Sequence, residues 1–398
     1  MTKAARSLNE ASLSYRLLYK YARFVFRLFY TQLVIKDLEN VPSDKPLIFA
    51  SNHQNALMDA LAMLFAANRP VFFLARADLF KRPFIARILT FLKIMPVFRP
   101  RDQVDIVSEN KEVFHETARL ISLGQPMGIL PEGTYTPDKR LQTLKKGICR
   151  MAFEAAEATG FTMDLHIVPT GLDYSDYHRQ GSDLLIKFGE PIKVADYYEL
   201  YKSNPNRALT VLRDTLADSI RKLMINIDIP EEYVFIYNYS QEQTNKYLNE
   251  HHFRNKEERL TERFNKMKQE SERLKLLYRT DIDAYLQLKT SRSDLHDRLV
   301  KGEHKVSIIK KPGNVFSVLI SLLALALNFL PLLLSRHFSS GVEDPQFVGT
   351  MKYGTSLVLF PIWYLLLLLI LIPVFGFITG LSVVILAIVT AVLYLKYS

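Results

Sequence analysis

A histidine and an aspartate in the segment SNHQNALMD, residues 51–59, have the chemistry that proton transfer requires. A six-residue separation does not put His53 and Asp59 on one helix face, so we expect His53 in a turn and Asp59 in the first turns of the following helix. From there the carboxylate reaches back to Nδ1 of the imidazole and stabilises its charged form, which leaves Nε2 free as a general base. The alternative is a structural or surface pair, which a lone histidine and aspartate form more often.

A second candidate is ILPEGTYTPDKRLQTLKKG, residues 129–147, in which a predicted strand ends at Pro131. Ligands of parallel α/β sheets collect at such carboxyl ends. The turn there offers a carboxylate, a backbone without a side chain and a hydroxyl: Glu132, Gly133 and Thr134. Lys145 and Lys146 open the next helix, where positive charge is unfavourable unless an anionic ligand offsets it. The alternative is an ordinary strand-to-loop turn.

Arg99 and Arg101 follow a strand-like run in KIMPVFRPRD, residues 93–102. Their planar guanidinium groups suit two-point capture of a phosphate, and the alternative is a pair of solvated surface arginines. A formal net charge of +10 also favours an anionic partner, such as a lipid headgroup or a phosphorylated substrate. We expect no nucleic acid, because the basic residues cluster near membrane elements and form no recognition motif.

The elements that position these residues alternate between strands and helices from about residue 33 to 200. Short β-rich runs predict strands at 47–53, 70–76, 126–133 and 165–174. Helical spacing of apolar residues predicts helices at 59–68, 104–123 and 145–160. Alternating units of this length predict an α/β fold with a largely parallel sheet flanked by helices.

We expect no secretory signal in residues 1–32, because charged residues interrupt every apolar run there. A helix that begins after Ser12 gathers four basic residues in one stripe: Arg16, Lys20, Arg23 and Arg27. Most of its other residues are Leu, Tyr, Phe or Val, which predicts an amphipathic helix at the membrane interface. The alternative is a helix that packs on the domain with its charged face in water.

Residues 206–305 predict a helical arm rich in charge, beginning with an amphipathic helix at 206–225. Residues 314–335 are apolar over a length that crosses a bilayer. Residues 355–395 carry no charge and predict two further transmembrane helices or a membrane hairpin. The break falls among three residues: Pro373, Gly376 and Gly380. Lysines before the first crossing (Lys305, Lys310 and Lys311) place the catalytic domain in the cytoplasm, at the cell inner membrane if the source is bacterial.

A single cysteine, Cys149, excludes an internal disulfide and is consistent with a reducing compartment. In their order along the chain, the candidate motifs resemble the phospholipid/glycerol acyltransferase superfamily, which includes 1-acylglycerol-3-phosphate acyltransferases. The resemblance covers about residues 33–205. It rests on four blocks: His53 with Asp59, MPVFR ending at Arg99, Pro131 to Thr134, and Val168 with Pro169.

Two positions depart from the usual pattern of that superfamily. Five residues separate His53 from Asp59, where the family usually has four. Fungal glycerol-3-phosphate/dihydroxyacetone-phosphate acyltransferases resemble this chain in that spacing and in carrying membrane spans after the domain. Tyr135 replaces the arginine or serine that usually follows Glu–Gly–Thr, beside the expected phosphate site.

The resemblance implies that His53 deprotonates an acceptor hydroxyl, which attacks an acyl thioester while Asp59 stabilises the imidazolium. It implies that four residues hold the phosphate and glycerol of the acceptor: Arg99, Glu132, Gly133 and Thr134. Arg101, Lys145 and Lys146 are further candidate phosphate contacts. The implied donor is acyl-CoA or acyl-carrier protein, with no metal and no cofactor. The apolar run 79–95 lines an acyl channel, dips into the bilayer or belongs to the core.

The spacing and the trailing spans favour glycerol 3-phosphate (or dihydroxyacetone phosphate) as acceptor over 1-acylglycerol 3-phosphate. Either acceptor leads to phosphatidic acid in phospholipid biosynthesis. Two alternatives remain at this point. One is an acyltransferase for another lyso-lipid, such as a lyso-ornithine lipid, and the other is a catalytically idle, membrane-anchored lipid-binding protein.

Overall fold

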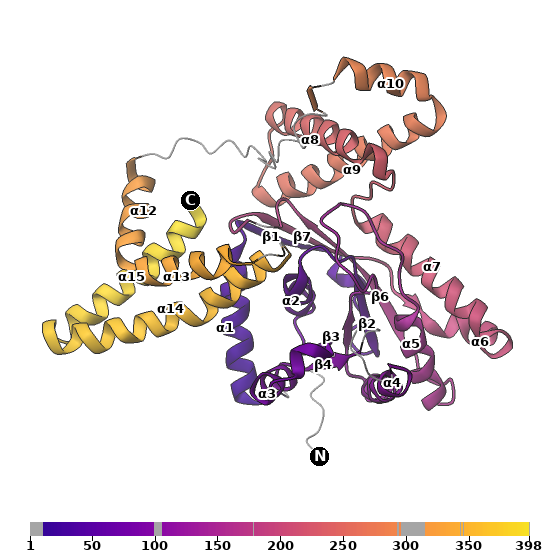
Figure 1. Ribbon diagram of the computed structural model, residues 1–398, viewed down its shortest axis with the longest axis horizontal. Coiled ribbons are helices and arrows are strands. Elements are labelled where there is room, and N and C mark those ends of the chain that lie inside the picture. Colours follow the sequence, from indigo (N-terminus) through magenta and orange to yellow (C-terminus); the bar gives the residue numbers. More distant parts are fainter. Residues whose placement is uncertain are drawn as a thin grey trace.

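Eight strands form one sheet in the described part of the computed structural model, which comprises residues 11–98, 106–177, 179–292, 294–295, 315–342, 344 and 346–397 (Figure 1). The strands are β1 Gln32–Lys36, β2 Leu47–Ser51, β3 Phe72–Arg76, β4 Ile94–Val97, β5 Met127–Ile129, β6 His166–Tyr174, β7 Asp183–Phe188 and β8 Ile192–Lys193. Their order across the sheet is β1-β7-β6-β2-β5-β3-β4, and β8 pairs with β6.

Strands β6, β2, β5, β3 and β4 run parallel to one another, whereas β7 and β8 are antiparallel to β6. This arrangement confirms the predicted α/β fold with a largely parallel sheet. Because β2 lies between β5 and β6, the turns that follow these three strands share one edge of the sheet.

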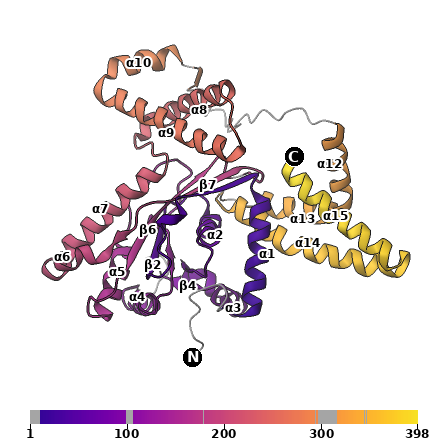
Figure 2. The same cartoon turned by 180° about the vertical axis from the view of Figure 1, so that it is seen from behind.

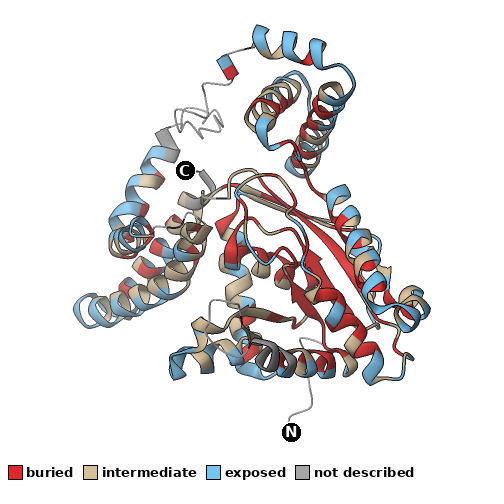
Figure 3. Cartoon of the chain, turned by 45° about the vertical axis from the view of Figure 1, so that its right-hand side comes forward, coloured by how far each residue is buried: buried red, intermediate tan, exposed pale blue. Residues whose placement is uncertain are grey.

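Helices cover both faces of the sheet, and the side-chain alternation of β2 shows why. Leu47 and Phe49 pack toward α1 (Leu13–Phe29) and α2 (Ala56–Ala67). Ile48 and Ala50 pack on the opposite face, toward α4 (Ile106–Ser122), α5 (Gly147–Ala158) and α7 (Pro205–Leu223). The strands between these two layers form the most buried part of the chain (Figure 3).

A short helix, α3 (Pro83–Phe91), lies within the apolar run whose place the sequence left open. Its apolar side chains are exposed, and Phe84 retains 72% of its accessible surface. The helix is therefore not core. The domain also contains α6 (Tyr198–Ser203) and single 3-10 turns at Leu38–Asn40, Ala77–Phe80, Val194–Tyr197 and Pro230–Glu232.

The charge-rich arm forms α8 (Tyr233–Glu250), α9 (Lys256–Thr280) and α10 (Ile282–Ser291). These helices enclose a small apolar cluster of their own, which includes Val34 of β1 and Leu185 of β7. Figure 2 shows α8 and α9 beside β7. The arm therefore packs against the antiparallel end of the sheet and is not a free spacer.

The last four helices are α12 (Val315–Leu327), α13 (Phe329–Ser340), α14 (Gln346–Phe375) and α15 (Phe377–Tyr397). Within the described residues, α14 and α15 are each long and apolar enough to cross a membrane. Gly376, with φ +83°, separates them, as one of the predicted break positions. The predicted crossing at 314–335 is divided between α12 and α13, which meet at an angle of 85°, as in a broken span or a re-entrant loop.

Asn328 and Pro331 explain that bend. Pro331 has no N–H to donate to the carbonyl of Leu327, and Trp363 Nε1 of α14 donates to it instead, at 2.8 Å. The buried Asn328 amide donates to the carbonyls of Ala324 and Ala387, both at 3.1 Å, and accepts from the Tyr364 hydroxyl at 3.0 Å. The bend is therefore fixed by hydrogen bonds to both long helices.

We expect Asn328→Ala to lower the free energy of unfolding in detergent micelles by roughly 1–2 kcal/mol, since hydrogen bonds between membrane helices contribute about 0.6 kcal/mol each. The control is Ser382→Ala, because Ser382 donates only within its own helix, to Ile378. Chemical denaturation of the purified variants measures the difference. Equal stability of the two variants would contradict this account of the bend.

Candidate functional site

The turn between β2 and α2 carries His53 to the shared carboxyl edge of the sheet. Ala50 of β2 pairs with Ile129 of β5 and Pro169 of β6, so β2 and β5 end close together, whereas β6 continues past them to Tyr174. Asn52 extends this pairing beyond β2, because its amide accepts from Leu172 N at 2.8 Å and donates to Leu172 O at 3.0 Å. These two hydrogen bonds hold the first residue of the turn in place against β6.

His53 and Asp59 are in contact as their spacing predicts. Nδ1 of His53 lies 2.8 Å from Oδ2 of Asp59, in the first turn of α2. The carboxylate is fully buried, whereas the imidazole is 15% exposed. The hydrogen bond to Nδ1 sets the tautomer and stabilises an imidazolium ion, and Nε2 remains for a proton of a bound ligand.

Three further donors hold the Asp59 carboxylate. The backbone N–H groups of Gln54 and Asn55 donate to Oδ2, both at 2.8 Å. The hydroxyl of Tyr174, the last residue of β6, donates to Oδ1 at 2.7 Å. Burial and the neighbouring Asp59 raise the pKa of Tyr174 well above its usual value, so the phenol remains a donor. The charge of Asp59 is therefore compensated from several directions.

The first residue of α2, Ala56, has φ +38°, a left-handed conformation that L-residues adopt at a cost of about 1–3 kcal/mol. This conformation lets the chain turn sharply enough for Gln54 and Asn55 to direct their N–H groups at Asp59. The turn is thus strained and depends on its surroundings to keep its shape.

Glu132, which lies in the turn after β5, supports the turn between β2 and α2 through hydrogen bonds. Its Oε1 accepts from the backbone N–H of His53 at 2.7 Å and its Oε2 accepts from that of Gln142 at 2.8 Å. The side chain is 1% exposed and supports His53 in this structure, while its predicted hydrogen bond to a substrate hydroxyl stays a prediction. Both oxygens are turned inward because they satisfy buried N–H groups.

Gly133, Thr134 and Lys145 form the exposed part of the second motif. Gly133 has φ +70°, which a glycine adopts without strain. A Cβ at that position would lie 3.5 Å from Cγ of Lys145, so the lysine stem runs beside the turn. A backbone without a side chain, a hydroxyl and an ammonium group therefore face solvent together, close to His53.

The other residues predicted to contact a phosphate are Lys146, Arg99 and Arg101. Nζ of Lys146 donates to the Thr210 hydroxyl of α7 at 2.8 Å, so this side chain is directed at the helix layer and not at the turn. Arg99 and Arg101 lie outside the described residues. Within the described residues, no group of three or more His, Cys, Asp or Glu side chains is arranged to hold a metal ion.

Sequence reasoning missed Tyr174 and Asn55 as parts of the site. Tyr174 is the last residue of the strand predicted at 165–174, and that position at the carboxyl end is its only local signal. Asn55 lies at the N-cap of α2, and its amide donates to the carbonyl of Tyr177 at 3.0 Å. Its Oδ1 is buried without a hydrogen-bond partner among the described residues.

A buried ion cluster lies behind the second motif. Lys139, which follows the glycine turn, and Arg263 of α9 both donate to the Asp173 carboxylate. Nearby positive charge lowers the pKa of Asp173 although burial opposes this. The cluster ties the helical arm to the loop after Glu132, so the arm supports the site from behind.

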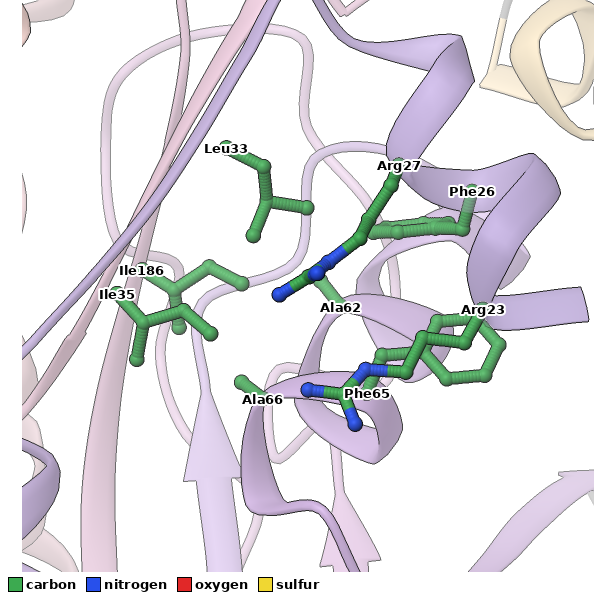
Figure 4. A pocket seen from close by; sticks show the side chains of 9 residues that line it. All are labelled: Arg23, Phe26, Arg27, Leu33, Ile35, Ala62, Phe65, Ala66 and Ile186. Carbon is green, nitrogen blue, oxygen red and sulfur yellow. The ribbon is translucent and has the colours of Figure 1, made fainter. Parts of the chain in front are cut away.

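The N-terminal helix α1 packs on the domain through four aromatic residues: Tyr15, Tyr19, Phe26 and Phe29. Arg23 and Arg27 border a cavity of about 10 Å³ between α1, α2 and the sheet (Figure 4). Its other lining residues are Phe26, Leu33, Ile35, Ala62, Phe65, Ala66 and Ile186. This space is no larger than one water molecule needs and is separate from the His53 site.

Comparison with known proteins finds that part of the chain is similar to acyltransferases. Residues 32–173 match the model of a family described as Acyltransferase. The chain is 29% identical over 190 residues to a chloroplast 1-acyl-sn-glycerol-3-phosphate acyltransferase of Brassica napus, which covers 47% of this chain and 50% of the relative. It is 31% identical over 113 residues to a glycerol-3-phosphate O-acyltransferase of Saccharomyces cerevisiae, covering 28% and 15%.

Among solved structures, the chain is similar to the 1-acyl-sn-glycerophosphate acyltransferase of Thermotoga maritima, with 18% identity and a TM-score of 0.39. That match covers 52% of this chain and 77% of the other. The chain spans about half the length of the plant relatives that it matches.

The Glu132 brace predicts a pH dependence of stability. Burial raises the pKa of Glu132 from 4.5 to about 7, although the N–H groups of Gln142 and His53 oppose the shift. The folded state then binds a proton that the unfolded chain has lost, so this residue's contribution is present below pH 4.5 and is lost as the pH rises to about 7. The unfolding temperature of the wild type relative to Glu132→Gln should fall across this window and stay constant above it. A constant difference from pH 4.5 to 9 would contradict the assignment.

Proposed function

We propose that this chain, whose residues 32–173 form an acyltransferase domain of the phospholipid/glycerol acyltransferase superfamily, transfers a fatty acyl group from a thioester to a hydroxyl of a glycerol-phosphate acceptor. The observation that carries the proposal is the contact between His53 Nδ1 and the buried Asp59 carboxylate, beside an exposed turn with hydrogen-bond donors. The relatives' names support the acceptor class.

In the proposed reaction Nε2 of His53 takes the proton of the acceptor hydroxyl as its oxygen attacks the thioester carbonyl. The new C–O bond gives a tetrahedral oxyanion. Its collapse breaks the C–S bond, and the imidazolium returns the proton to the leaving thiolate. Asp59 stabilises the imidazolium between these steps, and Tyr174 with the N–H groups of the turn keeps the carboxylate in place.

The acceptor phosphate, in this proposal, binds at the exposed turn. Gly133 supplies an approachable backbone, Thr134 a hydroxyl and Lys145 a positive charge. Arg99 adds a guanidinium group by resemblance to the family. Glu132 acts as a positioning residue, because its hydrogen bond to His53 N fixes the base and not the substrate.

Glycerol 3-phosphate or dihydroxyacetone phosphate is our first acceptor, on the spacing of His53 and Asp59 and the match to the yeast enzyme. 1-Acylglycerol 3-phosphate is the second, favoured by the longer match to the plant enzyme. Acyl-CoA or acyl-carrier protein is the donor in both cases. Another lyso-lipid, such as a lyso-ornithine lipid, remains an outcome of the assay below.

We further propose a multi-pass membrane protein with its catalytic domain in the cytoplasm. Two helices, α14 and α15, are able to span a bilayer. The lysines at 305, 310 and 311 precede the membrane helices and favour the cytoplasmic side. On α1, Leu13, Leu17 and Phe24 are exposed, which supports contact of this helix with the membrane surface.

Loss of the base provides the direct test. We expect His53→Ala to lower kcat about 10²–10⁴-fold, the usual contribution of a general base. The control is His166→Ala, because the His166 ring makes its hydrogen bond to the nearby backbone carbonyl of Asp164. Transfer of a radiolabelled acyl group from acyl-CoA to glycerol 3-phosphate by purified membranes measures the rate. Undiminished transfer by His53→Ala would refute the mechanism.

The acceptor is identified by competition. Membranes that contain the chain receive labelled acyl-CoA with glycerol 3-phosphate, 1-acylglycerol 3-phosphate and lyso-ornithine lipid at equal concentration. We expect 1-acylglycerol 3-phosphate to be the main labelled product, formed from glycerol 3-phosphate, and His53→Ala membranes to form none. Mass spectrometry of the lipids separates the products. Labelled ornithine lipid as the main product would reject a glycerol-phosphate acceptor.

A further inference from the structure

The start of α14 lies against the catalytic turn, although α14 is one of the two helices able to span a membrane. In Figures 1 and 2 the end of α14 nearest the sheet lies beside α1 and α2. Residues 346–353 form this end, and Gly349 and Tyr353 are its buried residues. The membrane segment is therefore continuous with the site.

Gly349 makes the closest approach. A Cβ at this position would lie 3.1 Å from Oδ1 of Asn55 and 3.4 Å from the carbonyl oxygen of Tyr177. Asn55 donates its backbone N–H to Asp59 and directly precedes Ala56, the strained residue. The helix backbone thus packs on the residue that links the turn to its carboxylate, at a place where even a Cβ would require its neighbour to shift by a few tenths of an ångström.

A second contact joins the loop before α14 to the other motif. The hydroxyl of Tyr135, which follows Glu132, Gly133 and Thr134, donates to Oδ1 of Asp344 at 3.1 Å. Asp344 also accepts from the backbone N–H of Gln346, the first residue of α14. The position at which this sequence departs from its family therefore connects the glycine turn to the membrane helix.

A third link between α14 and Asp59 is a series of packed aromatic rings that ends at Tyr174. The hydroxyl of Tyr353 donates to Ala22 O of α1 at 2.9 Å, and its ring packs edge-on against Phe26 and Phe29. Those aromatic rings contact Tyr30, whose ring lies 6.1 Å from that of Tyr174. Tyr174 is the donor to Asp59 Oδ1.

We propose that residues 346–353 of α14 form a wall of the active site and position the turn between His53 and Asp59, so that the C-terminal helices take part in catalysis as well as anchoring. Gly349 is the positioning residue, since it acts through Asn55. The inference rests on the proposed acyl transfer for its kinetic readout but not for its geometric one. A strained turn needs support from packing, and α14 supplies that support on the face that the sheet leaves open.

The test compares two glycines of the same helix in the full-length protein. Gly349→Val inserts a branched side chain against Asn55, whereas Gly354→Val is the matched control because a Cβ there has nothing within 4 Å. We expect Gly349→Val to lower kcat about 10²-fold, the effect of a misplacement of about 1 Å, with KM for both substrates within about twofold. Gly354→Val should keep kcat and KM within about twofold of the wild type.

Gly349→Ala covers the case in which the valine variant does not fold. Its Cβ contact at 3.1 Å requires a smaller shift of Asn55, so we expect a smaller fall in kcat in the same direction. The unfolding temperature of each variant is measured in detergent. A fall in kcat at unchanged unfolding temperature and KM supports positioning, and a fall in unfolding temperature with normal kcat overturns it.

A second readout does not depend on activity. Diethyl pyrocarbonate modifies exposed imidazoles, and peptide mass spectrometry gives the rate at His53. We expect faster modification of His53 in Gly349→Val than in Gly354→Val, because the turn loses its support. Normal kcat and an unchanged modification rate in Gly349→Val, alongside an inactive His53→Ala, would reject the wall and leave the acyl transfer intact. A wild type that transfers no acyl group would reject the transfer, and the modification rates would still decide on the wall.

Discussion

The buried Asp59 carboxylate is the constraint on which the site depends. A buried carboxylate needs hydrogen bonds in place of water, and here the donors are the His53 ring, two N–H groups of the turn and the Tyr174 hydroxyl. The Tyr174 hydroxyl reaches Asp59 because β6 pairs with β2 and continues past its end, and the two N–H groups reach it because the chain turns sharply at Ala56. The hydrogen bonds of one carboxylate therefore depend both on the register of the strands and on the shape of the turn.

Around that charge, each of three neighbouring parallel strands supplies one group from its carboxyl end. β2 supplies His53, β5 supplies Glu132 and β6 supplies Tyr174. Glu132 and Asp59 are both buried acids, yet they differ in role. Asp59 stabilises charge on the imidazole ring, whereas Glu132 accepts from the backbone N–H of the same residue, and burial raises the pKa of Glu132 against the opposing effect of the N–H groups that it binds.

The features that depend on residues close together in the chain were predictable from the sequence. The six-residue separation of His53 and Asp59 was enough to place one in a turn and the other on a helix, and the alternation of strands and helices was enough for the sheet. Tyr174 was not predictable, because its bond to Asp59 spans 115 residues and depends on the pairing of β6 with β2. The direction of the Lys146 side chain was not predictable for a related reason, since its partner Thr210 belongs to α7, which lies far along the chain.

The bend at Asn328 was visible in principle, because an asparagine precedes a proline by three residues within an apolar run. A window of hydropathy averages over such residues and reports one span. The hydrogen-bond partners that make a bend stable, Trp363 and Tyr364, belong to a different helix.

That bend has a consequence for how the chain is threaded through a bilayer. The arm packs on the sheet, the stretch that follows it is rich in lysine, and Asp344 touches the catalytic turn. The 85° angle between α12 and α13 is the geometry of a broken span or of a re-entrant loop, and a re-entrant loop leaves and returns to the same side of the lipid. Under the proposed cytoplasmic placement of the catalytic domain, a re-entrant α12–α13 pair leaves α14 and α15 as one outward and one inward crossing, which would bring Tyr397 to the same side of the bilayer as His53.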